Sequence, residues 1–290
     1  MADQKPIDQH SGMETTGHEW DGIRELNTPL PRWWLWVFYA TVVWAVGYWI
    51  AMPAWPYFTG FTKGVLGYSS RADVEAKIAA AEKAQGGLNR EIANSTLEQI
   101  RTDPKLLEFA IAGGRSAFRV NCTQCHGSGA QGAPGYPNLN DDIWLWGGRL
   151  QDIAFTITHG VRNTTDEDAR VSDMPAFLKD DILTKQQVDD VVEYVLSLNK
   201  RSTDAKAAAR GKAIFAENCA VCHKEDASGN PEVGAPPLKN DIWLYGGDRE
   251  TLTQTVSFAR RGVMPAWGQH LDPTTIKKLA IYVYSLGGGK

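Results

Sequence analysis

The chain has 290 residues, of which 43% are hydrophobic and 22% charged, so it is long enough for two or three folded domains and is not globally disordered. Its formal net charge of −4 argues against non-specific nucleic-acid binding, which needs a basic surface. Four cysteines are too few for a disulfide-rich scaffold of this length.

A membrane-spanning helix is the first predicted element. Residues 33–52 form a run of 20 without Asp, Glu, Lys or Arg, and a helix of that length spans about 30 Å, one hydrocarbon thickness. Seven of the eleven tryptophans lie before residue 60, as in interfacial aromatic belts. A buried core helix would normally keep a polar face, and a cleaved signal peptide would not follow about 30 mostly polar residues. We therefore expect an uncleaved anchor, whose few flanking charges leave its orientation open.

A helical spacer is predicted to follow over residues 71–104. The stretch is rich in helix formers, with Ser70 as a candidate N-cap, and Gly86-Gly87 is expected to break the helix. We expect it to contribute no core. The alternative is a docking surface for another subunit.

The remainder of the chain repeats itself with a period near 97 residues. Five blocks match in one order, which indicates two copies of one domain joined near residues 200–208. The matched blocks are 114–118 with 211–215, 121–126 with 218–223, 142–148 with 241–247, 174–177 with 264–267, and 194–198 with 282–286.

Each copy contains C-x-x-C-H, the signature of covalent c-type haem attachment. Cysteines on one short turn can both form thioethers, and the next residue can turn its imidazole to the iron. A Cys₄ zinc site would have to pair across the two copies and would leave both histidines unexplained; a disulfide within each motif is the other alternative. The predicted haem-binding residues are Cys122, Cys125 and His126 in the first copy and Cys219, Cys222 and His223 in the second, with His126 and His223 as iron ligands.

Met174 and Met264 are the predicted sixth ligands of the iron. The other three of the five methionines lie before or at the end of the apolar run, whereas these two stand in matching Met-Pro-Ala-aromatic blocks. Methionine also fills gaps in cores, but equivalent positions after two haem motifs favour ligation. His159 and His270 do not align between the copies, and His159 is kept as an alternative ligand. His/Met coordination raises the reduction potential.

The sequence also predicts helices around both haem motifs, over residues 106–120, 184–199, 204–217 and 273–286. Gly114 and Gly211 would let the helices within each copy cross closely. The aromatic pairs expected beside these crossings are Phe118 with Tyr194 and Phe215 with Tyr282. Trp144 and Trp243 are expected to wall the haem or its loop.

These residues resemble the dihaem subunit III of cbb3-type cytochrome c oxidases. The resemblance rests on the two C-x-x-C-H motifs, the paired DIWL[WY]GG and MPA[FW] blocks, the end YVYSLGGGK and the stretch GHEWDGIRELNTPLPRWWLWVFYA, and it covers nearly the whole chain. It implies a mainly α protein with two tandem class I cytochrome c domains. The implied segments are a cytoplasmic N-terminal segment over 1–32, a transmembrane anchor over 33–55, a periplasmic helical spacer over 56–104, and cytochrome c domains over 105–200 and 201–290.

The resemblance implies two covalently bound haem c groups, with Met174 and Met264 as distal ligands. In that family each methionine serves the haem of the other domain, whereas pairing within each repeat is the simpler geometric interpretation of the repeat alone. Both arrangements stay open at this point.

The implied function is electron transfer without catalysis on this chain, because a His/Met iron is six-coordinate and closed to oxygen. A periplasmic or membrane-anchored cytochrome c donor would reduce one haem, and electrons would pass through a monohaem subunit to the oxygen-reducing catalytic subunit of a respiratory, proton-transporting complex. The location would be the bacterial inner membrane, with one span, a cytoplasmic N-terminus and periplasmic haem domains. The alternatives are a free-standing membrane-anchored dihaem carrier and a dihaem peroxidase, which would need an open iron.

Charge differs between the repeats. Residues 110–199 carry 7 Lys+Arg and 12 Asp+Glu, a net of −5, and residues 200–290 carry 13 and 9, a net of +4. The acidic first repeat, with its run at 166–168, would steer a cationic donor.

Overall fold

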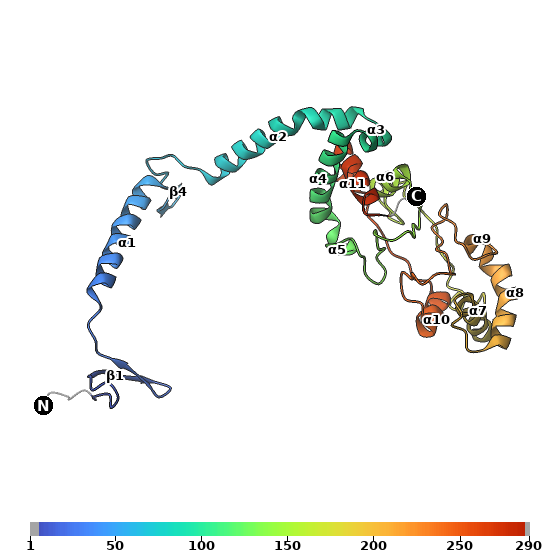
Figure 1. Cartoon of the computed structure of the whole chain (residues 1–290), viewed down its shortest axis with the longest axis horizontal. Helices are drawn as coiled ribbons and strands as arrows, with labels where there is room; N and C mark the ends of the chain where they lie inside the picture. Colours follow the sequence, from blue (N-terminus) through green and yellow to red (C-terminus); the bar gives the residue numbers. More distant parts are fainter. Residues whose placement is uncertain (1–5, 288–290) are drawn as a thin grey trace. The chain divides into compact units, whose positions relative to one another are not determined.

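The computed structural model describes residues 6–287 and is mainly helical (Figure 1). It consists of two units, one up to Ala84 and one from Gln85 onward. The first five and last three positions of the predicted segments 1–32 and 201–290 lie outside the described residues.

The first unit contains a hairpin and the expected apolar helix. Strands β1 (Thr15–Trp20) and β2 (Ile23–Leu26) pair antiparallel, and the turn between them has positive φ at both Asp21 and Gly22, as a type I′ hairpin turn requires. Helix α1 (Arg32–Ala51) has no buried residue and, among the described residues, is the one helix long and apolar enough to cross a membrane. A small hairpin of β3 (Pro56–Tyr57) and β4 (Gly60–Phe61) follows it.

The predicted spacer is one long helix followed by a short one, and two expectations about it are wrong. Helix α2 (Ser70–Asn94) continues through Gly86-Gly87, because each glycine costs a helix only about 1 kcal/mol and strong helix formers flank the pair. Its first turn is capped by the Ser69 hydroxyl, which accepts from the backbone N–H of Ala72, and not by Ser70. Helix α3 (Leu97–Thr102) begins with a capping box formed by Thr96.

The end of the spacer also forms core, contrary to expectation. Ile92 and Ile100 are fully buried in one cluster with side chains from three later helices. The Lys277 ammonium donates to the carbonyls of Ile92, Ala93 and Ser95 at 3.2, 2.8 and 2.8 Å, which closes the C-terminal end of α2. The sequence did not predict this burial, because the alanine-rich first half of α2 shows no stripe of large apolar residues.

The rest of the second unit is built from short helices with polar caps. Five of these helices begin at a residue whose side chain accepts hydrogen bonds from backbone N–H groups of the first turn, which fixes where the helix begins. These residues are Asp103, Thr184, Asp204, Asp248 and Asp272. Four of these helices match the predicted ones, and α6 and α10 were not predicted. The elements are α4 (Pro104–Asn121), α5 (Thr123–His126), α6 (Leu150–His159), α7 (Lys185–Leu198), α8 (Ala205–Asn218), α9 (Ala220–His223), α10 (Arg249–Phe258), the 3₁₀ turn η1 (Trp267–Gln269) and α11 (Pro273–Tyr284).

The repeats exchange their last helices, so the expected pairing within each copy is wrong. Helix α4 packs on α11, and α7 packs on α8. The ring centroids of Phe118 and Tyr282 lie 5.4 Å apart, and those of Tyr194 and Phe215 lie 5.1 Å apart. The reason is connectivity: only residues 199–204 separate α7 from α8, and a link this short makes consecutive helices antiparallel neighbours. Helix α11 then fills the equivalent groove on α4.

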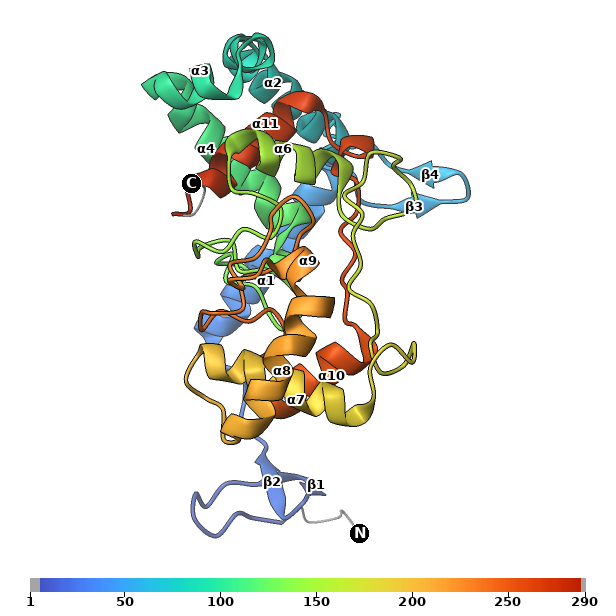
Figure 2. The same ribbon diagram turned by 90° about the vertical axis from the view of Figure 1, so that its right-hand side faces the viewer.

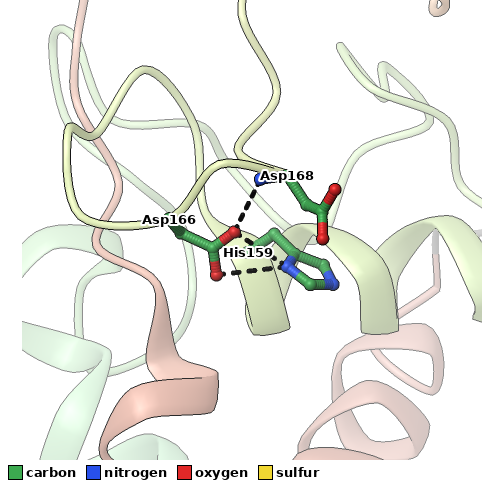
Figure 3. Close-up of side chains that lie close together, drawn as sticks. All are labelled: His159, Asp166 and Asp168. Carbon is green, nitrogen blue, oxygen red and sulfur yellow. Dashed lines mark hydrogen bonds and ion pairs between the residues drawn. The ribbon is translucent and has the colours of Figure 1, made fainter.

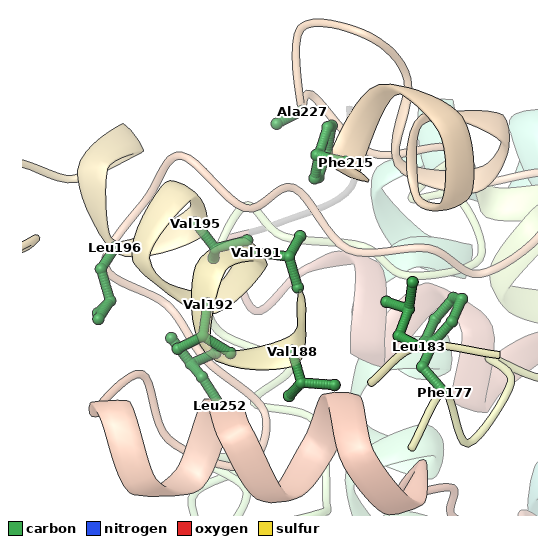
Figure 4. Packing of buried hydrophobic residues seen from close by; sticks show 10 residues of the cluster. All are labelled: Phe177, Leu183, Val188, Val191, Val192, Val195, Leu196, Phe215, Ala227 and Leu252. Carbon is green, nitrogen blue, oxygen red and sulfur yellow. The ribbon is translucent and has the colours of Figure 1, made fainter. Parts of the chain in front are cut away.

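Two packed bodies result, which we name the α4 body (residues 104–160 and 264–287) and the α8 body (residues 174–259). In the α8 body, valines of α7 meet Leu252 of α10 and Phe215 of α8 in one cluster (Figure 4). The chain crosses twice between the bodies, and the two crossing segments run antiparallel where Val161 and Met264 exchange backbone hydrogen bonds (Figure 2). The limits 105–200 and 201–290 stay predictions for the sequence repeats.

Candidate haem sites

Each C-x-x-C-H motif forms a single turn at the end of a long helix. Helix α4 runs directly into Cys122, and the backbone N–H groups of Cys125 and His126 donate to the Cys122 carbonyl at 3.2 and 2.9 Å. The second motif repeats this geometry after α8, from Cys219 to His223, with the same two distances. All four cysteines are free thiols in the described part of the chain, so no disulfide joins either pair.

The thiols do not come together as a zinc site. Cys122 packs in the cluster of the α4 body and Cys219 in that of the α8 body. Within residues 6–287, no group of metal-ligating side chains contains a cysteine. Burial raises the pKa of both Cys122 and Cys219 to about 11, so both are neutral thiols.

Both motif histidines are held in one orientation by a backbone carbonyl. His126 Nδ1 lies 3.0 Å from the Pro137 oxygen, and His223 Nδ1 lies 2.9 Å from the Pro236 oxygen. The carbonyl can only accept, so Nδ1 carries the proton and Nε2 keeps its lone pair for a metal. Burial lowers the pKa of both histidines, which favours the neutral imidazole that ligates iron. Sequence reasoning missed these prolines, although both end a matched G-[AY]-P triplet.

The two methionines lie with the motif of the other repeat. A cavity of about 200 Å³ is lined by Met174 together with Cys219, Cys222 and His223. Met264 is half-buried in the cluster of the α4 body that contains Cys122. The simpler expectation, with each methionine beside the histidine of its own repeat, is therefore wrong, because the crossing segments carry Met174 and Met264 to opposite bodies.

The residues present fit a haem. The indole N–H groups of Trp144 and Trp243 are buried and have no hydrogen-bond partner within residues 6–287. A buried N–H normally has an acceptor, and a haem propionate is an acceptor of suitable charge. Apolar side chains such as Phe177, Val191 and Leu252 also line the cavity, as a macrocycle requires. Arg162, Arg260 and Arg261 line it too, and none of them belongs to a motif that predicts haem binding.

The unmatched histidines lie elsewhere. His159 Nδ1 is 3.1 Å from each carboxylate oxygen of Asp166, which also accepts the backbone N–H of Asp168 (Figure 3). The ligand atoms of these three residues lie within 4.8 Å of one another, but nothing else there points to an ion. We assign the cluster to the ordering of the loop after α6. His270 is exposed at the end of η1.

Comparison with known proteins gives consistent matches along the chain. Residues 12–59 match the N-terminal domain of cytochrome oxidase-cbb3, FixP; residues 111–199 match cytochrome c; and residues 206–283 match cytochrome C oxidase, cbb3-type, subunit III. The chain is 53% identical over 287 residues to the cbb3-type cytochrome c oxidase subunit CcoP of Cereibacter sphaeroides, covering 99% of each chain. It is also 53% identical over 291 residues to subunit FixP of Rhizobium meliloti, covering 100% of each chain.

Proposed function

Because the chain belongs to the CcoP/FixP family, the membrane-anchored subunit III of cbb3-type cytochrome c oxidases, we propose that it binds two haem c groups and passes electrons between them toward the oxygen-reducing subunit. Its cytochrome c domains imply covalently bound haem c. When bound, haem iron supplies reversible one-electron transfer. The observation that carries the proposal is the cavity that gathers Met174, Cys219, Cys222 and His223.

The proposed ligand sets are crossed between the repeats. One haem would be held by Cys122, Cys125 and His126 with Met264, and the other by Cys219, Cys222 and His223 with Met174. The proline carbonyl of each G-[AY]-P triplet keeps its imidazole turned for ligation, and a methionine thioether would supply the other protein ligand. With both ligands in place there would be no free position for oxygen, so the chain would transfer electrons and leave oxygen reduction to the catalytic subunit.

The proposed location is the bacterial inner membrane, with the N-terminus cytoplasmic and the haem domains periplasmic. Covalent haem attachment is expected on the periplasmic side, and α1 supplies the one candidate span among the described residues. The proposed partners are the catalytic and monohaem subunits and a periplasmic or membrane-anchored cytochrome c donor. The match of residues 12–59 to an oxidase-specific N-terminal domain supports subunit assembly over a free-standing carrier.

Purification of the tagged full chain in mild detergent tests this function. We expect two haem c per chain in a pyridine haemochrome assay and the other haem subunits in the same particle. The matched control replaces residues 6–59 by an unrelated single-span anchor, and it should keep both haems but lose the partners. A wild-type chain that carries two haems and purifies alone would make the free carrier correct.

A further inference from the structure

Two aromatic side chains leave their own repeat and pack on a glycine of the other. They stand at the same position of the two DIWL[WY]GG blocks, Trp146 in the first and Tyr245 in the second. A Cβ placed on Gly234 would lie 2.3 Å from Trp146 Cζ2, and a Cβ placed on Gly135 would lie 3.2 Å from Tyr245 Cε1. Each ring therefore lies directly against the backbone of the opposite repeat. The Gly135 N–H also donates to the Leu244 carbonyl at 2.7 Å.

These glycines are the first residues of the G-[AY]-P triplets that orient the motif histidines. Gly135 precedes Pro137 by two residues, and Gly234 precedes Pro236 by two. Both glycines have positive φ, 88° and 63°, so the turn excludes ordinary side chains at these positions. Without a side chain, the glycine cannot anchor the turn, and the ring from the other repeat supplies the packing.

An arginine lies over each of the two rings. The guanidinium carbon of Arg260 lies 4.6 Å from the Tyr245 ring centroid, and that of Arg170 lies 5.6 Å from the Trp146 centroid. Both arginines are themselves anchored, since Arg260 donates to the Thr255 hydroxyl and Arg170 to the Thr156 hydroxyl, at 3.0 and 2.9 Å. Each ring thus contacts both an anchored cation and a loop of the opposite repeat.

We infer that Trp146 and Tyr245 are positioning residues, each holding the loop that orients the motif histidine of the other repeat. This inference rests on the proposed function. A carbonyl that accepts from Nδ1 raises the basicity of the imidazole at its metal-binding nitrogen. Loss of the Trp146 ring loosens the 234–236 turn, weakens the bond to His223 and raises the reduction potential at that site. Each repeat would thus give the other both a methionine ligand and an aromatic ring that holds the histidine-orienting loop.

Trp146→Leu in the full, haem-loaded chain tests the inference. Tyr245 also lines the cavity of His223, so its replacement would act on that site directly, whereas Trp146 is absent from the lining residues. We expect faster amide hydrogen exchange in residues 230–238, measured by mass spectrometry, and little change in residues 131–139. Trp146→Tyr copies the residue of the second repeat and should keep the wild-type pattern. Phe258→Leu, at an exposed aromatic that ends α10 and does not line the cavity, is the matched control and should alter neither site.

A redox titration supplies the second readout. The component whose potential Met174→His lowers should move upward in Trp146→Leu, and the other component should move less. Unchanged exchange in 230–238, or equal acceleration in both loops, overturns the inference. If Trp146→Leu fails to retain haem, Trp146→Phe, with its smaller ring, decides by the same two measurements. Failure of the proposed function is distinguishable, because the wild-type chain would then hold fewer than two haems or Met174→His would lower neither potential.

Discussion

The proposed ligation by Met174 and Met264 joins each methionine to the haem motif of the other repeat. In a chain carrying Cys219→Ser and Cys222→Ser, only the site at His126 can hold haem covalently. We expect Met264→His to lower the potential of that haem, because imidazole in place of thioether favours ferric iron, and Met174→His, the matched control, to leave it unchanged. Spectroelectrochemistry checks both variants. If Met174→His lowered the potential and Met264→His left it unchanged, each methionine would instead ligate the haem of its own repeat.

Glu193 is a buried carboxylate that ties α7 to the start of α8 and to α10. Burial alone would raise its pKa, but hydrogen bonds from Arg249, Ser202 and the Thr203 backbone outweigh burial and hold the pKa of Glu193 at about 2. Its stabilisation is therefore complete above its ordinary pKa of 4.5 and is lost as the pH falls from there toward 2.

Glu193→Gln should reproduce that loss at neutral pH. The amide cannot pair with Arg249 as a carboxylate does, so we expect the free energy of unfolding at pH 7 to fall by about 2 kcal/mol. The difference from wild type should shrink as the pH drops below 4.5, the ordinary pKa of this carboxyl. Denaturant unfolding at several pH values measures it. Glu217→Gln, at an exposed position, is the control. A difference independent of pH would show that the carboxylate charge is not responsible.

At the level of elements, the contact of α4 with α11 depends on one of two adjacent glycines. A Cβ on Gly114 would lie 2.2 Å from the Lys278 carbonyl oxygen and 2.6 Å from Tyr282 Cβ, whereas a Cβ on Gly113 would lie 2.8 Å from Cδ of the buried Lys278 side chain, whose ammonium donates to Asn89. A side chain can shift where backbone cannot, and alanine favours a helix over glycine by about 1 kcal/mol, so Gly113→Ala should cost less than Gly114→Ala. Gly114→Ala should lower the free energy of unfolding by about 1–3 kcal/mol through overpacking.

Hydrogen exchange locates the effect of Gly114→Ala. We expect faster amide exchange in α11, residues 273–284, and no change in α7, residues 185–198, because α11 is the helix that packs on α4. Acceleration in α7 alone would mean that the helices pair within each repeat.

The helices themselves could be predicted from sequence, but not their partners. Caps such as Thr184 and Asp272 and the apolar periodicity locate α7 and α11 closely. Phe118 and Phe215, however, stand at equivalent positions and can pack on either tyrosine, so the repeat pattern cannot select the pairing. The pairing is selected by the short link after α7, a constraint of chain length that the repeated motifs do not encode. The ligand residues were identifiable from their chemistry, whereas their grouping depends on that tertiary choice.

For the whole molecule, exchanging the helices redistributes charge. Residues 104–160 and 264–287 carry 6 Lys+Arg and 5 Asp+Glu, a net of +1, and residues 174–259 carry 10 and 13, a net of −3. For the sequence repeats the order of net charge is opposite, with −5 for the first repeat and +4 for the second. Net charge would therefore attract a cationic donor to the α8 body rather than to the α4 body. Asp166 is also engaged by His159, which leaves Glu167 and Asp168 as the exposed part of the acidic run at 166–168.

The end of the spacer belongs to the haem-binding unit, and truncation measures its contribution. Chains secreted with a cleavable signal and starting at residue 85 should be as stable as chains starting at residue 70, because Val74 and Ile78 on the omitted turns are exposed. Chains starting at residue 104 lose Ile92 and Ile100, which are fully buried. At about 1.5–3 kcal/mol for each buried side chain, they should lose about 3–6 kcal/mol of unfolding free energy and melt at a lower temperature.

Lys277→Met separates the hydrogen bonds from the apolar burial. It removes the three bonds to the end of α2 but keeps Ile92 and Ile100, so in the chain starting at residue 85 it should cost only part of the truncation loss. In the chain starting at residue 104 the acceptors are already gone, and the same substitution should cost nothing. Denaturant unfolding of the four haem-loaded proteins completes the cycle. Equal stability of the chains starting at 85 and 104 would make the segment a spacer after all.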